Sequence, residues 1–250
     1  MSRGGVAGAR TFHVSPAFLV RASDIGEADR RLTFFTKAAG VVSSVAKSAW
    51  KSRKRFGGLL QRYVLLDIVW TETPGKMPVL DSASFSASFW SIAEEWDRVR
   101  HADYLLELAV EIFPQGSPEP RAFDLLLDGM RSLSAGENPE KVARRTETRF
   151  LSIGGWGPDL SSCKKCGKME GMWYRFMPSR GGVLCESCAE GNGARISLGA
   201  VKTWKALQGP GAPAKGRFQV PDGIAGELQA VIPKYVEYCI GKTLRSLQGR

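Results

Sequence analysis

Four cysteines in two closely spaced pairs are the residues of this chain whose types and spacing could hold a metal ion. Cys163 and Cys166 form one Cys-x-x-Cys pair, Cys185 and Cys188 form a second, and 18 residues separate the pairs. This separation is typical of zinc ribbons, in which four thiolates hold one Zn²⁺ tetrahedrally. Four protein ligands leave no coordination position for water or substrate. The sequence therefore predicts one structural zinc ion per chain, with disulfides or unliganded thiols as the alternatives.

Catalytic side chains are sparse in the rest of the sequence. The chain has two histidines, His13 and His101, and no glycine-rich phosphate loop. Its glutamates are spread over amphipathic helical sequence, and no acidic pair stands out. The fifth cysteine, Cys239, lies among apolar residues and is expected to be a small buried side chain. These observations predict a binding protein that is not an enzyme.

A basic run without any acid lies between residues 46 and 62 and forms the second chemical feature. The side chains that we predict to bind DNA are Lys47, Trp50, Lys51, Arg53, Lys54, Arg55 and Arg62. Lysine and arginine neutralise phosphates without reading base sequence. Trp50 could stack on a base or pack against its own domain, and Phe56 is expected to anchor the run in the core.

Charge is unevenly distributed along the 250 residues, which carry a formal net charge of +10. Residues 1–85 hold 13 Lys and Arg against 6 Asp and Glu, residues 86–162 hold 8 against 13, and residues 163–250 hold 14 against 6. The two basic parts favour a polyanion partner, although solubility alone could also explain them. No apolar run reaches the roughly 18 residues of a membrane span, and no secretory signal is recognisable. We expect a cytoplasmic, nucleoid-associated protein without membrane contact.

The periodicity of the sequence changes near residue 85. Short segments rich in Val, Phe, Thr and Leu predict strands near residues 17–23, 31–37, 40–49, 63–72 and 77–85, as in a small antiparallel barrel. Helical spacing follows near residues 89–113, 121–133, 139–154, 197–207 and 225–247. The expected α+β architecture is a flexible extension (1–15), a barrel domain (16–85) and a helical domain (86–250) with a zinc module at about 160–190. Residues 209–216 are expected to form a flexible link.

Several segments, in their order along the chain, resemble the RecO family of bacterial recombination mediators. They are SDIGEADRRLTFFTKAAGVVSSVAKSA, FGGLLQ, ARRTETRFLSIGGWGPDL, CKKCG and GGVLCESC. The resemblance implies an oligonucleotide-binding (OB) barrel and a helical domain with a zinc finger. It also implies binding to single- and double-stranded DNA, annealing of complementary strands, and cooperation with RecR in loading RecA onto DNA coated with single-strand-binding protein. The chain departs from the family in two places, because Trp50 stands where an arginine is usual and Leu60-Gln61-Arg62 stands where Leu-Gln-Pro is usual.

A basic island on the third expected helix is the candidate partner site. It contains Lys141, Arg144, Arg145 and Arg149. The resemblance implies that the position of Arg144 contacts the acidic tail of single-strand-binding protein, and an arginine fork can hold its carboxylate. We therefore predict tail binding at Arg144 and Arg145. The alternative is a solvated face whose arginines pair with Glu140 and Glu147.

Two other functions are compatible with these features. A zinc-ribbon module that binds RNA or an RNA polymerase would combine a barrel with a Cys₄ site, and similar binding to RNA and DNA would favour it. A zinc-dependent hydrolase would need an open metal position, which four cysteine ligands do not leave.

Overall fold

The computed structural model describes residues 9–50, 52–56, 58–209 and 220–247, which form two compact units. The first unit comprises Met1–Met130 and the second Arg131–Arg250. Most of the link expected at residues 209–216 lies outside the described residues. No helix in the described part of the chain has the length and apolar character required to cross a bilayer.

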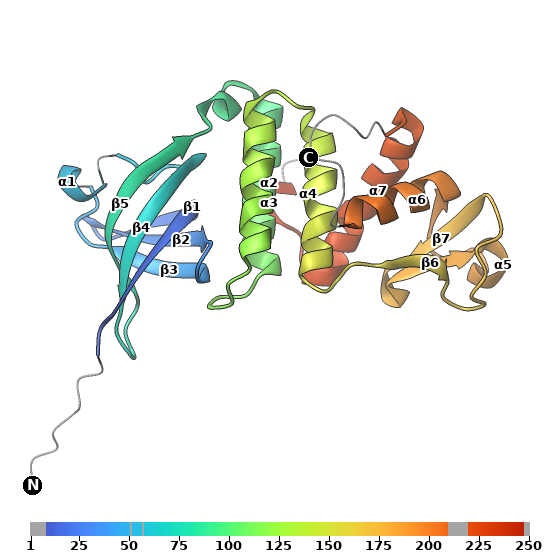
Figure 1. Cartoon of the computed structure of the whole chain (residues 1–250), viewed down its shortest axis with the longest axis horizontal. Coiled ribbons are helices and arrows are strands. Elements are labelled where there is room, and N and C mark those ends of the chain that lie inside the picture. Colours follow the sequence, from blue (N-terminus) through green and yellow to red (C-terminus); the bar gives the residue numbers. More distant parts are fainter. Residues whose placement is uncertain (1–8, 51, 57, 210–219, 248–250) are drawn as a thin grey trace, which may run out of the picture. The chain divides into compact units, whose positions relative to one another are not determined.

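The first unit contains a closed five-stranded barrel (Figure 1). Its strands are β1 (Thr11–Ile25), β2 (Asp29–Thr36), β3 (Gly40–Ala46), β4 (Val64–Glu72) and β5 (Val79–Ser88). The strand order is β1-β2-β3-β5-β4, and antiparallel pairing of β4 with β1 closes the barrel. Alternating side chains such as Leu32, Phe34 and Val42 fill its interior. The predicted α+β fold with an OB-type barrel is confirmed.

The first strand begins earlier than the sequence suggested. Residues Thr11–Ser15, expected to be part of a flexible extension, belong to β1 and pair with β4, where Thr11 lies opposite Glu72. His13 stacks on Trp70 with ring centroids 5.0 Å apart. The Gly-rich start of the chain concealed this pairing, because a strand that is half exposed carries little apolar signal of its own.

Two long helices complete the first unit. A 3₁₀ turn, η1 (Trp90–Glu94), leads into α2 (Trp96–Ile112), and α3 (Pro120–Ser134) continues across the boundary between the units. Phe123 of α3 lies with its ring centroid 5.6 Å from that of Phe18 on β1 and 6.1 Å from that of Phe35 on β2. These aromatic contacts join α3 to the barrel within the compact unit Met1–Met130.

The second unit combines three main helices with a small sheet. The helices α4 (Pro139–Ile153), α6 (Leu198–Gln208) and α7 (Asp222–Ile240) pack on one another. Asn138 and Ser197 cap α4 and α6 by accepting hydrogen bonds from the amides of Lys141 and Ala200. Helix α7 ends at Ile240, before the expected residue 247, and a short 3₁₀ turn, η3 (Arg245–Leu247), follows.

The sheet of the second unit was not expected from the sequence. Its strands are β6 (Asp159–Cys163), β7 (Trp173–Met177), β8 (Gly182–Cys185) and β9 (Ala194–Ser197), in the order β6-β8-β7-β9. The turns η2 (Pro178–Arg180) and α5 (Glu186–Ala189) flank β8. Phe176 on β7 packs on Trp204 of α6 with ring centroids 4.7 Å apart, and Tyr235 of α7 meets Phe176 edge-on. This aromatic cluster holds the sheet on the helices.

Candidate metal centre and nucleic-acid interface

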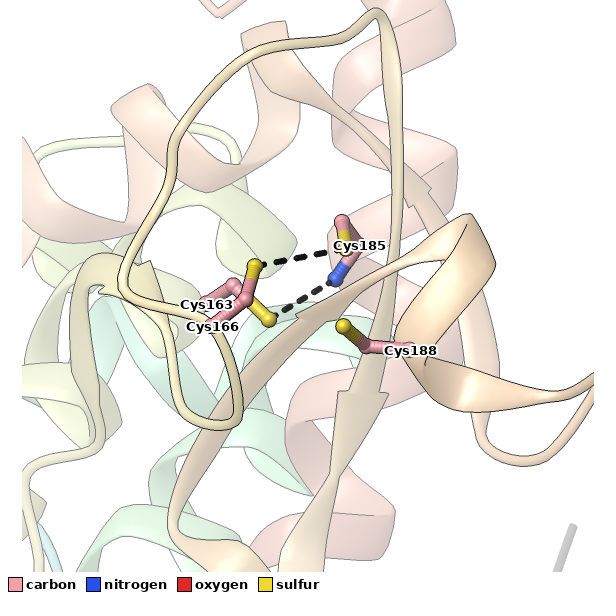
Figure 2. A group of neighbouring side chains, drawn as sticks. All are labelled: Cys163, Cys166, Cys185 and Cys188. Atoms are coloured by element: carbon pink, nitrogen blue, oxygen red, sulfur yellow. Dashed lines mark hydrogen bonds between the residues drawn. The ribbon is translucent and has the colours of Figure 1, made fainter.

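The four paired cysteines converge in the second unit (Figure 2). Cys163 ends β6, Cys185 ends β8, and Cys188 lies in α5. Their ligand atoms and that of Cys166 all lie within 4.8 Å of one another, and the sulfurs of Cys166 and Cys185 are 3.8 Å apart. A tetrahedral site with Zn–S bonds of about 2.3 Å would place its sulfurs about 3.8 Å apart. The arrangement can therefore bind one metal ion, and all five cysteines of the chain are free thiols.

Tight turns bring these thiols together. Gly167 follows the first pair at a φ of 75°, and its amide donates to the carbonyl of Cys163. The amide of Cys185 points at the sulfur of Cys163 at a distance of 3.4 Å. Burial alone would raise the pKa of the Cys163 thiol, but backbone amides of Cys166, Cys185 and Lys165 outweigh it and lower the pKa to about 6. Amides that stabilise a thiolate prepare the group for metal ligation.

Tyr174 on β7 is a buried neighbour of the cysteine cluster. Its side chain is fully buried, and its hydroxyl has no hydrogen-bond partner within the part of the chain that the structure describes. Burial raises the pKa of Tyr174, and the neighbouring charges of Cys185 and Cys163 raise it further. A neutral hydroxyl donor beside the thiols fits a site that gathers anionic sulfur around a cation.

The basic run connects β3 to β4 on the barrel, as predicted. Lys47 and Trp50 are exposed in this connection, and a single helical turn, α1 (Arg53–Phe56), follows them. Phe56 is buried in the barrel core, which confirms its anchoring role. Lys51 lies outside the described residues, and Arg53 and Lys54 are placed only as part of α1.

Arg55 stabilises the conformation of this connection. Its guanidinium donates from Nε to the hydroxyl of Ser52 at 2.9 Å and from Nη2 to the carbonyl of Lys47 at 2.5 Å. The guanidinium also lies over the ring of Phe56, 5.0 Å from its centroid. Arg55 therefore fixes the loop that presents Lys47 in addition to carrying charge itself.

Trp50 projects from the barrel and is held from two sides. The residue is 61% exposed, its indole N–H donates to Asp24 at 3.3 Å, and the guanidinium of Arg30 lies 4.8 Å from its ring centroid. Arg30 in turn lies 3.4 Å from Asp24. Both predicted roles are compatible with this position, because the indole packs against residues of its own barrel while the residue keeps 61% of its surface exposed for stacking on a base.

Arg62 differs from the rest of the run because an acid partly neutralises it. Its guanidinium pairs with Asp103 on α2 at 2.5 Å, and the hydroxyl of Tyr63 donates to the same carboxylate at 2.7 Å. Burial, together with the hydrogen bond to Asp103, raises the pKa of Tyr63, which stays a neutral donor at ordinary pH. Arg62 is thus less available to a phosphate than Lys47.

Sequence reasoning missed the contribution of β2 to this surface. Arg30 and Arg31 lie opposite Ala46 and Val45 at the end of β3, next to the basic connection. The adjacent arginines were visible in the sequence, but their register against β3 depends on strand pairing. They extend the basic surface from the connection onto the barrel wall.

The predicted partner residues are more enclosed than expected. Arg144 is 7% exposed and pairs with the fully buried Glu147 at 2.6 Å. Arg145 donates to Glu137 and to the hydroxyl of Ser132. The pairing with Glu147 was expected as one alternative, yet it is buried rather than solvated. Phe150 and Leu151, which follow the basic island on α4, are fully buried.

Comparison with known proteins covers nearly the whole chain. The family model described as "Recombination protein O N terminal" matches residues 12–89, and the model described as "Recombination protein O C terminal" matches residues 93–248. The chain is 32% identical over 232 residues to a DNA repair protein RecO of Anaeromyxobacter sp. (strain Fw109-5), with 90% of each chain covered. It is 28% identical over 232 residues to the DNA repair protein RecO of Myxococcus xanthus (strain DK1622), with 92% of this chain and 93% of the relative covered.

Proposed function

Since the chain belongs to the RecO family of DNA repair proteins, we propose that it is a non-catalytic recombination mediator that binds single- and double-stranded DNA and anneals complementary strands. With RecR, it would help to load RecA onto DNA coated with single-strand-binding protein. The domain of residues 16–85 would bind DNA, and the domain of residues 86–250 would carry the metal site and the partner site.

One observation carries the DNA-binding proposal. The connection between β3 and β4 presents Lys47 and the exposed Trp50 on a closed OB-type barrel, beside Arg30 and Arg31 of β2. Proteins that hold single strands combine cations for the phosphates with aromatic rings for the bases. Lys51, Arg53 and Lys54 would add phosphate contacts from the same connection, and Arg62 would contribute less because Asp103 pairs with it.

We propose that the metal is one structural Zn²⁺ per chain, held by Cys163, Cys166, Cys185 and Cys188. The mutual distances of their ligand atoms support a closed tetrahedral site. When bound, the ion would fix the turns that join β6, β8 and α5. It would stabilise the second unit without taking part in the annealing of strands.

We further propose that the acidic tail of single-strand-binding protein docks on α4, at the basic island that contains Arg144 and Arg145. Arg145 is the better contact of the two, because its side chain is more exposed than that of Arg144. Its bonds to Glu137 would have to yield to the tail carboxylate. A tail peptide should bind in the micromolar range, which corresponds to about −8 kcal/mol.

Strand annealing with and without single-strand-binding protein is the experiment that tests this function most directly. Two complementary oligonucleotides, one carrying a fluorophore and the other a quencher, should anneal faster with the chain than alone. The acceleration should persist when both strands are coated with single-strand-binding protein. Equal rates with and without the chain would refute the proposed function, and equal acceleration of RNA annealing would favour the RNA-binding alternative.

A charge-reversal variant tests the assignment of the barrel surface. Reversing Lys47, Lys51, Arg53 and Arg55 together should remove four phosphate contacts, each contributing about 0.7 to the slope of log affinity against log salt on single strands. Between 50 and 200 mM salt the parent should therefore lose about 50-fold more affinity than the variant. Unchanged affinity and slope would move the binding surface elsewhere, and circular dichroism controls for folding of the variant.

A further inference from the structure

One of the exposed tryptophans, Trp173, lies on the sheet of the second unit. Trp173 on β7 is 40% exposed and Met172 beside it is 74% exposed, although Tyr174 and Phe176 on the same strand are fully buried. Neighbouring side chains of a strand point to opposite faces, so one face of β7 belongs to the core and Trp173 lies on the other. The accessible indole directly follows the exposed methionine in the sequence.

Two arginines stand on the same face as this tryptophan. Arg175 and Arg195 are directly opposite each other in the antiparallel pairing of β7 with β9, where like charges destabilise a sheet. The guanidinium of Arg195 lies over the indole of Trp173, 4.1 Å from its centroid. A single carboxylate oxygen of Glu186 faces both arginines, at 3.1 Å from Arg195 and 3.6 Å from Arg175. One acid for two arginines leaves this face with a net positive charge.

The same combination occurs on the barrel. There the exposed Trp50 has Arg30 over its ring, and the carboxylate of Asp24 holds that arginine. Each unit thus presents an accessible indole, an arginine stacked on it and an acid that positions the arginine. The two groups come from unrelated elements, a barrel loop in one unit and the paired strands β7 and β9 in the other.

We propose that the outer face of β7 and β9 is a second binding surface for single-stranded nucleic acid, in which Trp173 stacks on an unpaired base and Arg175 and Arg195 contact the adjoining phosphates. A protein that anneals two complementary strands has to hold both, and a surface on each unit would supply one for each strand. This inference rests on the proposed function, which it extends from one strand-binding surface to two. Indole stacking selects single strands, because the bases of a duplex are not available.

Substitution of Trp173 in the full chain tests the proposal. Binding of a fluorescein-labelled oligothymidine is measured by anisotropy for the parent and for Trp173→Ala, Trp173→Phe and the control Met172→Ala. The loss of one base stack should weaken single-strand binding by Trp173→Ala about 5- to 150-fold and slow annealing, while duplex binding changes less than twofold. Trp173→Phe should recover most of the affinity, and Met172→Ala should match the parent.

The arginines provide a readout that does not depend on the indole. Arg175→Gln combined with Arg195→Gln should reduce the salt slope on single strands by about 1.4, which corresponds to two phosphate contacts. Zinc content and circular dichroism show whether each variant is folded. If Trp173→Ala loses its metal, the salt slope of the double arginine variant tests the proposal instead.

The failure of this inference can be told apart from a failure of the proposed function. If the sheet variants have the affinity, annealing rate and salt slope of the parent, the second surface is overturned. The proposed function would still stand if the barrel charge-reversal variant no longer binds DNA. Equal losses on single strands and duplex in Trp173→Ala would also overturn it, since stacking cannot affect a paired base. If both the barrel and the sheet variants bind DNA as the parent does, the DNA-binding surface lies elsewhere on the chain. The proposed function itself fails only if the parent does not accelerate annealing.

Discussion

Removing Arg144 should destabilise the second unit before it affects any partner. Arg144 and Glu147 are three residues apart on α4, and their side chains form an ion pair of 2.6 Å with little access to water. Replacing Arg144 removes the positive charge that faces the buried carboxylate of Glu147, and breaking a buried ion pair is destabilising. Arg144→Glu is the least favourable change, because it would place two carboxylates in the same enclosed position.

The magnitude follows from this burial. Breaking a buried ion pair costs about 3–5 kcal/mol, whereas replacing both members by apolar residues of similar volume is often neutral or stabilising. Since total stability is about 5–15 kcal/mol, Arg144→Ala should remove a large part of it. The double variant Arg144→Met with Glu147→Leu should have a free energy of unfolding that is at most about 1 kcal/mol below that of the parent, or higher than it. Lys141→Ala, an exposed change on the same helix, should cost less than about 0.5 kcal/mol.

Urea denaturation followed by circular dichroism measures these differences, and titration with the tail peptide separates stability from docking. If the double variant is folded and still binds the peptide, Arg144 has a structural role and Arg145 becomes the main candidate contact. Loss of the peptide from a double variant of parental stability would make Arg144 the direct contact. The reasoning from burial would be refuted if the free energy of unfolding of Arg144→Ala were within about 1 kcal/mol of that of the parent.

Three further changes test other parts of the molecule. Replacing any one of the four paired cysteines by serine should abolish binding of the single zinc ion and lower the free energy of unfolding by several kcal/mol, yet folded protein should still anneal DNA. A metal analysis that finds well under one zinc per chain in the parent would contradict this. Phe176→Ala should cost about 3–5 kcal/mol in denaturant unfolding because it empties the cluster with Trp204, and a cost below 1 kcal/mol would be inconsistent with that packing. Asp103→Ala should cost about 1–3 kcal/mol by leaving the buried hydroxyl of Tyr63 without its acceptor, and should strengthen DNA binding by releasing Arg62; weaker binding by folded protein would exclude this account.

The barrel could be predicted because its signals are local. Each strand is a short apolar segment between turn residues. The sequence pattern therefore predicted the basic run between the third and fourth strands, where it lies in the structure. The early start of β1 could not be predicted in this way. Residues Thr11–Ser15 become a strand by pairing with β4, and that pairing brings together segments about 60 residues apart in the sequence.

The sheet around the cysteines was missed for a related reason. Its four strands have only four or five residues each, too few for a clear alternation of apolar and polar side chains. Cys163 and Cys185 also end two of these strands, so cysteines occupy positions where the sequence pattern would otherwise show core residues. Cysteine spacing correctly predicted that the four thiols come together, but only strand pairing reveals the outer face that carries Trp173.

Arginine is the residue whose role the sequence predicted least well, and the reason is physical. Its charge is the same everywhere in the chain, but its availability depends on the acids and rings that the fold brings to it. Arg144 is enclosed with Glu147, with 8% of its side chain exposed. Arg62, Arg30 and Arg195 are each paired with an acid but keep part of the side chain exposed, and the last two also lie over accessible indoles. A basic run therefore indicates that a polyanion is the partner, while the particular contacts depend on which arginines keep a free side toward solvent. Pairing, rather than the count of charges, selects the residues that can meet DNA.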